Sequence, residues 1–374
     1  MVEPKVRGPV ANMEGKALSV KGPMDPDQLG VTLTHEHIFI DLRKTHQPYR
    51  KYIVVDDRLV ADPPDADFPA TELASWEAKL DLSNLHLARE VAPVTDNYLL
   101  ADENVAIQEV LEYKKHGGNT IVDVTSIGLK RDPLALRRVS ESTGVNIIMG
   151  TAYYQRVYHP DDMDRRTVEE LTDIIVRDVA VGAYDTDIRA GIIGEVGING
   201  GPLITNELKS MRAAARASRL TGAPICIHLG GQGAEKHTIL DIVEDEGVDL
   251  GHVILGHCDG IAADTPFVLE LLARGVYVAF DNLGREPAVV EPSSTAVIAE
   301  SIPPLLEAGY EDRILLSQDV CWKTSLKAYG GLGYSFILEQ FLPRLRDLGV
   351  TDSQVDKAMV ENAKRVLTFV RPRD

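Results

Sequence analysis

Residues 190–231 read "AGIIGEVGINGGPLITNELKSMRAAARASRLTGAPICIHLGG" and contain one complete strand–helix–strand unit. The two ends, residues 190–198 and 223–231, are short and mostly apolar runs of the kind that forms buried β-strands. The segment 206–222 has helical periodicity and ends on Gly222, a residue favoured at a helix C-terminus. Two apolar strands joined by a helix are typical of parallel neighbours in a sheet that helices cover on its faces.

The same unit recurs along the chain. Six further apolar runs are predicted to be strands, at residues 31–40, 119–126, 146–154, 252–260, 276–284 and 313–320. Eight parallel strands alternating with helices predict a closed (β/α)8 barrel, the TIM barrel. An open, doubly wound sheet is the alternative fold. The glycine-rich stretches, however, lack both the GxGxxG order of a dinucleotide site and the Lys-Ser/Thr ending of a P-loop, which favours the barrel.

One segment departs from a minimal barrel. Residues 44–101 follow the first predicted strand and are rich in Pro and Asp. Because the loops after barrel strands surround the active-site face, we predict that this insertion lies over the barrel mouth as a lid-like segment. The chain contains no repeat or low-complexity tract, so we expect a single barrel domain spanning residues 1–374.

The charge balance restricts the partners of the chain. Acidic residues number 57 and basic residues 39, for a net charge of −18, and the basic residues are scattered. We therefore expect a small-molecule substrate and no nucleic-acid or membrane partner. No stretch approaches the ~20 apolar residues of a membrane span, and the first residues lack an apolar signal core, which predicts a cytoplasmic location. The oligomeric state stays open, with a homodimer as the candidate.

The ends of the predicted strands carry side chains that bind metals. In a TIM barrel, catalytic residues lie at the C-terminal ends of the strands. Glu195, His228 and His257 follow one another at intervals of 33 and 29 residues, about one strand–helix unit each, so they should meet on one rim. Because side chains alternate along a strand, His35 and His37, two residues apart, should lie on one face of the first strand. The candidate metal ligands are His35, His37, Glu195, His228, His257 and Asp319.

This ligand set, from the HxH of "LTHEH" to "SQD", resembles that of the amidohydrolase superfamily and, within it, the phosphotriesterase-related family. The resemblance covers nearly the whole barrel. It implies two divalent ions, most often zinc, with manganese or cobalt as alternatives, that share a bridging hydroxide. It also implies that His35, His37 and Asp319 hold a buried ion and that His228 and His257 hold a more exposed one.

One residue departs from the phosphotriesterase pattern. That enzyme bridges its ions with a carboxylated lysine that follows the "GII" of strand four. Here Gly194 follows "GII", and Glu195 is the nearest acid, as in the glutamate-bridged branch of the family. We therefore predict that Glu195 bridges the two ions, and the difference argues against phosphotriesters as the natural substrate.

The predicted activity is hydrolysis of a carboxylic ester, lactone or amide, with phosphotriester cleavage as a side activity. Asp319 is the predicted catalytic residue, because a carboxylate beside the attacking oxygen can take its proton and pass it to the leaving group. Two alternatives remain: a metal-dependent isomerase or decarboxylase of the same superfamily, and a non-catalytic small-molecule binding protein. The intact ligand set argues against the second alternative.

Loops after the strands should set substrate specificity. The candidates for substrate binding are Tyr153, Tyr154, Arg285, Trp322 and Lys323. A cationic residue in the pocket would suit a carboxylate, sulfonate or phosphate group of the substrate.

Two further sets of residues are expected to have structural roles. Three cysteines, Cys226, Cys258 and Cys321, are too few and too unevenly placed for a disulfide framework. Strand alternation directs Cys226 into the barrel interior, one layer below His228. Six histidines outside the strand ends are expected to be solvated or structural: His46, His86, His116, His159, His237 and His252.

Overall fold

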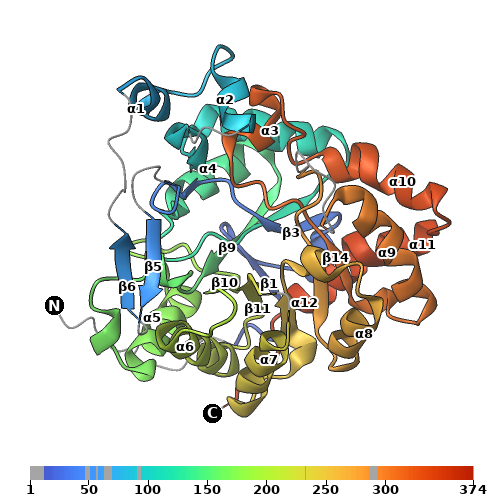
Figure 1. The fold of residues 1–374 in the computed structure, drawn as a ribbon. Coiled ribbons are helices and arrows are strands. Elements are labelled where there is room, and N and C mark those ends of the chain that lie inside the picture. Colours follow the sequence, from blue (N-terminus) through green and yellow to red (C-terminus); the bar gives the residue numbers. More distant parts are fainter. Residues whose placement is uncertain are drawn as a thin grey trace.

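The computed structural model describes residues 12–46, 51–55, 58–62, 70–90, 94–231, 233–285 and 293–373. Eight parallel strands form one sheet in the order β3-β8-β9-β10-β11-β12-β13-β14, so every strand pairs with its neighbours along the chain. They lie at the centre of the molecule, surrounded by helices (Figure 1). Their bounds are β3 Thr32–Glu36, β8 Thr120–Asp123, β9 Asn146–Thr151, β10 Ile192–Ile198, β11 Ile225–Leu229, β12 Val253–Leu255, β13 Tyr277–Phe280 and β14 Ile314–Leu316.

The first and last strands of the sheet meet through the segments at their ends. The His35 N–H donates to Ser317 Oγ (2.9 Å), and the Asp319 N–H donates to the His35 carbonyl (3.1 Å). The eight strands therefore form a nearly closed ring, and the predicted (β/α)8 barrel is confirmed. Each predicted strand run contains one of these strands, although β3 ends at Glu36 and leaves His37 one residue beyond it.

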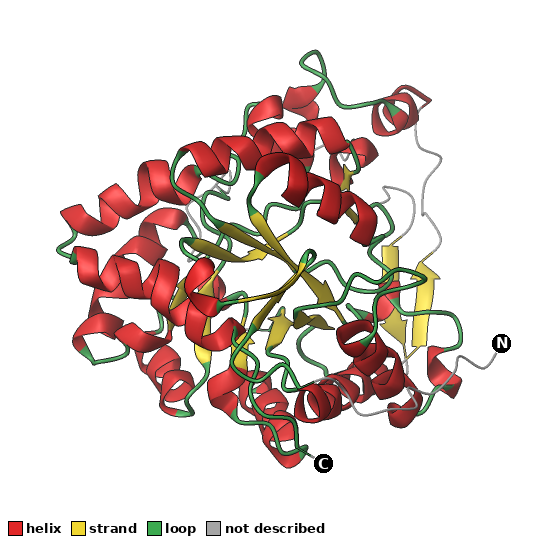
Figure 2. Cartoon of the chain, turned by 180° about the vertical axis from the view of Figure 1, so that it is seen from behind, coloured by secondary structure: helices red, strands yellow, loops and turns green. Residues whose placement is uncertain are grey.

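Helices cover the outside of the barrel (Figure 2). Helix α5 begins at a Thr167 capping box, and α6 ends at Gly222, whose φ of +74° is a left-handed conformation that glycine adopts without strain. The main helices are α3 Glu103–Lys115, α4 Pro133–Thr143, α5 Val168–Ala180, α6 Thr205–Thr221, α7 Glu235–Asp245, α8 Thr265–Ala273 and α9 Thr295–Glu307. The chain ends with α10 Leu342–Asp347, α11 Asp352–Asp356 and α12 Asn362–Leu367.

Apolar side chains fill the interior of the barrel below its rim. A buried cluster joins residues from the barrel strands, including Cys226, to Ala17 and Leu29 near the N-terminus and to Val366 of α12. Ala17 belongs to a short hairpin, β1 Ala17–Ser19 and β2 Gly22–Met24. Because this interior is packed among the described residues, an active site is expected outside it, at the C-terminal ends of the strands. Cys226 is fully buried in this cluster, as predicted.

The segment after β3 is joined to the barrel at both ends. Strand β4 (Ile40–Asp41) pairs antiparallel with β7 (Leu99–Leu100), and Lys323 Nζ lies 2.5 Å from Asp96 Oδ2. Between them the structure describes the hairpin β5 Lys51–Val55 and β6 Arg58–Asp62, then α1 Ala70–Glu77 and α2 Leu85–Glu90. In Figure 1 the hairpin lies beside α5, and α1 and α2 lie on the side of α3. Residues 47–50, 56–57, 63–69 and 91–93 of the predicted lid lie outside the described residues.

The lid role of this segment and the single-domain organisation stay predictions. In the described part of the chain, no helix is both long enough and apolar enough to cross a membrane. The cytoplasmic location and the homodimer also stay predictions.

Candidate metal-binding active site

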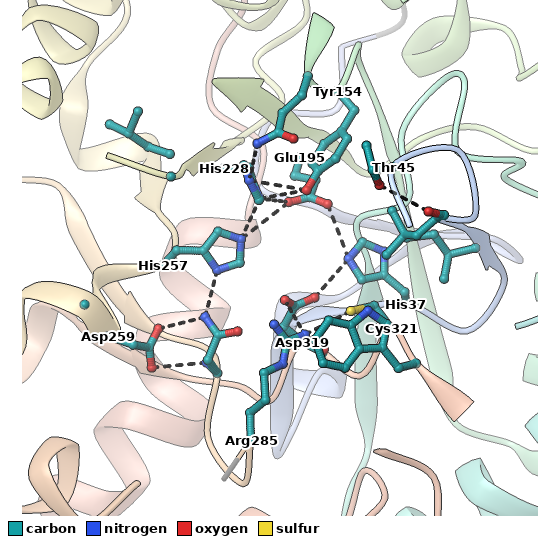
Figure 3. A pocket seen from close by; sticks show the side chains of 18 of the residues that line it. His37, Thr45, Tyr154, Glu195, His228, His257, Asp259, Arg285, Asp319 and Cys321 are labelled. Carbon is teal, nitrogen blue, oxygen red and sulfur yellow. Dashed lines mark hydrogen bonds and ion pairs between the residues drawn. The ribbon is translucent and has the colours of Figure 1, made fainter. Parts of the chain in front are cut away.

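A cavity of about 660 Å³ opens at the C-terminal ends of the barrel strands (Figure 3). Five of the six candidate ligands line it, and the sixth, His35, is fully buried beside them. The lining residues are His37, Ile40, Leu42, Thr45, His46, Tyr154, Gln155, Glu195, His228, Leu229, Gly230, His257, Asp259, Gly260, Asn282, Arg285, Ser293, Asp319, Cys321 and Trp322.

Glu195 lies at the centre of the candidate ligands. Its Oε2 atom lies 3.3 Å from His35 Nε2, 2.9 Å from His228 Nδ1 and 3.8 Å from His257 Nε2. Its Oε1 atom lies 3.3 Å from His37 Nε2. Each of the four histidines therefore directs one ring nitrogen at the same carboxylate. Figure 3 shows His228 and His257 on one side of Glu195 and His37 on the other.

Asp319 completes the inner group of atoms. Its Oδ1 atom lies 3.2 Å from His37 Nε2, and His35, His37 and Asp319 offer ligand atoms within 4.8 Å of one another. His35, Glu195 and His257 form a second group within the same limit. His228 Nδ1 lies 2.6 Å from His257 Nε2. The structure thus brings all six candidate ligands together.

These atoms have the chemistry and spacing that a divalent metal ion requires. Ligand atoms bonded to a tetrahedral Zn²⁺ at ~2.0–2.1 Å lie ~3.3–3.4 Å apart, close to the 3.2 and 3.3 Å distances at His37. Among the described residues, the buried His35 Nε2 makes no well-aligned hydrogen bond, although Glu195 Oε2 lies 3.3 Å away. A buried polar atom without a partner is costly, and a bound cation would supply one. The side chains present therefore fit a divalent ion.

The carboxylates make the site favourable for positive charge. Burial alone would lower the pKa of both His37 and His257, but nearby carboxylates outweigh burial. Asp319 and Glu195 raise the pKa of His37 to about 9, and Asp281 with Glu195 raises that of His257 to about 10. A metal ion that binds here must displace protons from these rings.

The strand that carries Glu195 has an irregular register. Ile193 of β10 pairs with Ile225, and Val196 pairs with Ile227, so one extra residue stands on β10 between the two pairs. A side chain at Gly194 would place its Cβ 2.7 Å from Cys226 Cβ, which explains the glycine. The extra residue is a β-bulge, which redirects the strand just before Glu195.

Glu36 was missed by the sequence analysis. It points away from His35 and is fully buried, and burial raises its pKa to about 7. It accepts hydrogen bonds from Ser317 Oγ (2.7 Å), Gln318 N–H (2.7 Å) and Val320 N–H (2.8 Å). These bonds hold the turn that carries Asp319, whose φ is +49°.

Asp281 was also missed. It directly follows β13 and is fully buried, with its carboxylate against the rings of His35 and His257 on the side away from Glu195. For the rings of His37 and His228, neutral residues contact the nitrogen that faces away from Glu195. Thr125 Oγ1 lies 2.9 Å from His37 Nδ1, and Gln155 Nε2 lies 3.0 Å from His228 Nε2. The expectation that catalytic residues lie at the C-terminal ends of the strands would also have identified Asp281, had it been applied to the seventh barrel strand.

The model of the Phosphotriesterase family matches residues 15–367. The chain belongs to the phosphotriesterase family. N-acetyltaurine hydrolase from Danio rerio is 35% identical over 368 residues, which cover 96% of this chain and 100% of the relative. A resiniferatoxin-binding protein from Rhodobacter sphaeroides, solved by crystallography, is 36% identical with a TM-score of 0.84 and covers 95% of this chain and 96% of that chain. A lactonase from Listeria monocytogenes is 25% identical with a TM-score of 0.73, at 95% and 99% coverage.

Two predictions are confirmed by these relatives. The resemblance to the phosphotriesterase-related family extends over nearly the whole chain, and the named relatives include a hydrolase and a lactonase, so the chain is an enzyme of the hydrolase class. The side chains able to hold a metal are clustered in the structure.

Three of the five predicted substrate-binding residues of this phosphotriesterase-family chain line the cavity: Tyr154, Arg285 and Trp322. Tyr153 is packed in the core with 1% of its surface exposed, and Lys323 pairs with Asp96. Neither belongs to the lining among the described residues. Contact of any of the five with substrate stays a prediction.

Arg285 lines the cavity next to Asp319 and contacts it. Its Nη2 atom donates to Asp319 Oδ2 (2.9 Å), to the Asp319 carbonyl (2.8 Å) and to Cys321 Sγ (2.9 Å). Its guanidinium carbon lies 4.5 Å from the centre of the Trp322 ring. Burial alone would raise the pKa of Asp319, but Arg285 and the hydrogen bond with His37 hold it below its ordinary value. Asp319 is therefore an ionised carboxylate at neutral pH.

Of the six histidines expected to be solvated or structural, His46 lines the cavity, where it stacks on Tyr98 at 3.8 Å between ring centres. Its place depends on the path of the segment after β4, which local sequence does not specify. His159 and His252 are buried away from the candidate ligands, each bonded to a backbone carbonyl.

Proposed function

We propose that this chain is a binuclear metal-dependent hydrolase that cleaves a carboxylic amide, ester or lactone. One observation supports this most strongly: two groups of inward-facing nitrogen and oxygen atoms share the carboxylate of Glu195. His35, His37 and Asp319 would hold one ion and His228 with His257 the other, while Glu195 would bridge both. Zinc is the first choice for such ligands, with manganese or cobalt as alternatives.

Bound ions in this position would lower the pKa of water and polarise the scissile carbonyl. The residues of the chain would supply the proton transfer. Asp319 is ionised and lies at the rim of the cavity, so it can accept the proton of the attacking water and deliver it to the leaving nitrogen or oxygen. The water oxygen ends in the carboxylate product, and the carbon–nitrogen or carbon–oxygen bond breaks.

The cavity also favours a substrate with an anionic group. Arg285 lines it, and within the described part of the chain all of its side-chain hydrogen bonds come from Nη2. Its Nε and Nη1 atoms can therefore donate to a carboxylate or sulfonate. Since N-acetyltaurine hydrolase is a relative at 35% identity, N-acyl amino acids and N-acyl aminosulfonates are the first substrates to test.

The test is a substrate screen with protein loaded with Zn²⁺, Mn²⁺ or Co²⁺. It compares N-acyl amino acids, N-acyl aminosulfonates, lactones, aryl esters and paraoxon-type triesters in water labelled with oxygen-18. We expect turnover of an acyl substrate with labelled oxygen in the acid product, and slower cleavage of triesters. A product without solvent oxygen would instead support an isomerase or decarboxylase, and tight binding without turnover a binding protein.

A further inference from the structure

We propose that Asp281 is a positioning residue for metal binding: its one carboxylate orients a histidine from each of the two proposed metal sites. The inference rests on the proposed metal centre. It concerns a residue that would not itself bind an ion, because the two histidine rings lie between its oxygens and Glu195.

Each oxygen of Asp281 contacts a different ring. Oδ2 lies 3.0 Å from His35 Nδ1, and Oδ1 lies 2.8 Å from His257 Nδ1. The backbone N–H of His257 donates to both oxygens, at 3.0 and 3.2 Å. Space for this arrangement depends on Gly256, where a Cβ would lie 3.0 Å from Asp281 Oδ2 and 3.3 Å from His35 Nδ1.

The direction of these bonds decides which nitrogen can bind metal. A carboxylate only accepts hydrogen bonds, so both Nδ1 atoms must carry the hydrogen. A neutral imidazole has a single lone-pair nitrogen, and in both rings that nitrogen is then Nε2. Both Nε2 atoms are the ones that face Glu195, at 3.3 Å for His35 and 3.8 Å for His257. Asp281 therefore selects the tautomer in which His35 and His257 are ligands.

A neighbouring amide supports this assignment. Asn282 Nδ2 lies 3.1 Å from His257 Nδ1, but its hydrogens have acceptors at Asp259 Oδ2 (3.2 Å) and Asp281 Oδ1 (3.4 Å). The amide can therefore use both hydrogens without His257, which leaves Nδ1 of that ring to donate to Asp281.

The other two histidines lack such a fixed partner. The outer nitrogen of His37 meets the hydroxyl of Thr125, and that of His228 meets Gln155 and the hydroxyl of Tyr154. A hydroxyl can donate or accept, and an amide can present either its NH₂ group or, after a flip, its oxygen, so neither kind of partner forces one tautomer. Only a partner that cannot donate forces the hydrogen onto Nδ1. Among the contacts described for the four rings, His35 and His257 have such a partner at Nδ1, and in both cases it is the carboxylate of Asp281.

Asp281→Asn is the direct test. The asparagine keeps one acceptor oxygen but turns an NH₂ group towards the other ring, which must then accept at Nδ1 and carry its hydrogen on Nε2. That ring loses its metal-binding lone pair. We expect the dissociation constant of at least one ion to rise about ten- to hundredfold, the usual effect of losing the outer partner of a histidine ligand.

Metal affinity would be measured by chelator competition with Zn²⁺ on folded wild type, Asp281→Asn and Asp178→Asn. Asp178 is a matched control, because it is equally buried but bonds to Arg131 and Thr151, both at 2.7 Å. We expect Asp178→Asn to lower thermal stability and leave both dissociation constants unchanged. Wild-type constants in Asp281→Asn would overturn the inference alone, whereas wild type without two ions would overturn the proposed function.

A measurement on the wild type covers the case in which Asp281→Asn does not fold. Long-range proton–nitrogen NMR spectra of metal-loaded protein, labelled with ¹⁵N-histidine, distinguish the two nitrogens of each ring. We expect His35 and His257 to carry hydrogen on Nδ1 and to bind metal through Nε2. Coordination through Nδ1 at either ring would overturn the proposal.

Discussion

Glu195→Gln should remove metal from the protein without unfolding it. The carboxylate lies within 3.8 Å of a nitrogen from each of the four histidines, so it would be a ligand of both ions. Structural Zn²⁺ sites with four ligands are worth ~10–16 kcal/mol, or about 3 kcal/mol per ligand. Loss of one ligand per ion should therefore weaken each by ~10²-fold, at 1.4 kcal/mol per tenfold change. The glutamine NH₂ group would also compete with metal for an imidazole nitrogen.

The assay is elemental analysis after dialysis against a weak chelator, with circular dichroism to verify folding. Glu109→Gln is the matched control, since Glu109 is a buried carboxylate that accepts bonds from the backbone of Lys327 and Ala328 instead. Because no carbamate is needed, reactivation of metal-free wild type should not depend on bicarbonate. Two ions retained at wild-type affinity in Glu195→Gln, or bicarbonate-dependent reactivation, would refute the reasoning.

Three further predictions concern turnover, specificity and stability. Asp319→Asn should lower kcat by at least ~10²-fold, the usual size of a lost acid/base function, and near wild-type turnover with both ions bound would contradict that role. Arg285→Gln should raise KM for an anionic amide by about tenfold or more relative to its effect on KM for a neutral analogue, because a charge-assisted bond is lost. Equal changes in KM for both substrates would count against an anion contact. Burial lowers the pKa of His252 to about 4, while the unfolded value is ~6.5. Between these values the unfolded state binds the extra proton, so the free energy of unfolding should fall by up to ~1.4 kcal/mol per pH unit as pH drops from 6.5 to 4. Urea titrations of metal-free His252→Asn should show a flatter profile, and identical profiles would argue against this origin.

The barrel and the six inward-facing residues could be predicted because each depends on a repeating local pattern. Apolar runs predict the strands, and the alternation of strands with helices predicts that the strands are parallel. The C-terminal ends of parallel strands must then meet on one rim. Because Glu195 is shorter than a carboxylated lysine, strand four had either to lie closer to the site or to bulge, and β10 has a bulge between Ile193 and Val196.

The supporting residues depend on contacts that no local pattern encodes. Asp281 contacts the rings of His35 and His257 on the side away from Glu195. In the sequence it is a single acidic residue after a strand, a pattern that is equally typical of a helix cap. Thr125 and Gln155 are neutral side chains of kinds found throughout the sequence. His46 enters the cavity because the segment after β4 bends towards β14, a tertiary effect. Sequence reasoning therefore finds ligands more readily than the residues that orient them.

Glu36 links the first and last strands of the barrel. It stands between two candidate ligands, yet its carboxylate fastens the turn at 317–320, some 280 residues later. Contacts this distant in sequence form slowly, because a long loop must close before they contribute. A nascent chain still lacking β14 would contain Glu36 but neither Asp319 nor the turn that Glu36 binds. Acquisition of the full complement of metal would then mark the end of folding, and a metal-sensitive probe would time the closure of the barrel during synthesis.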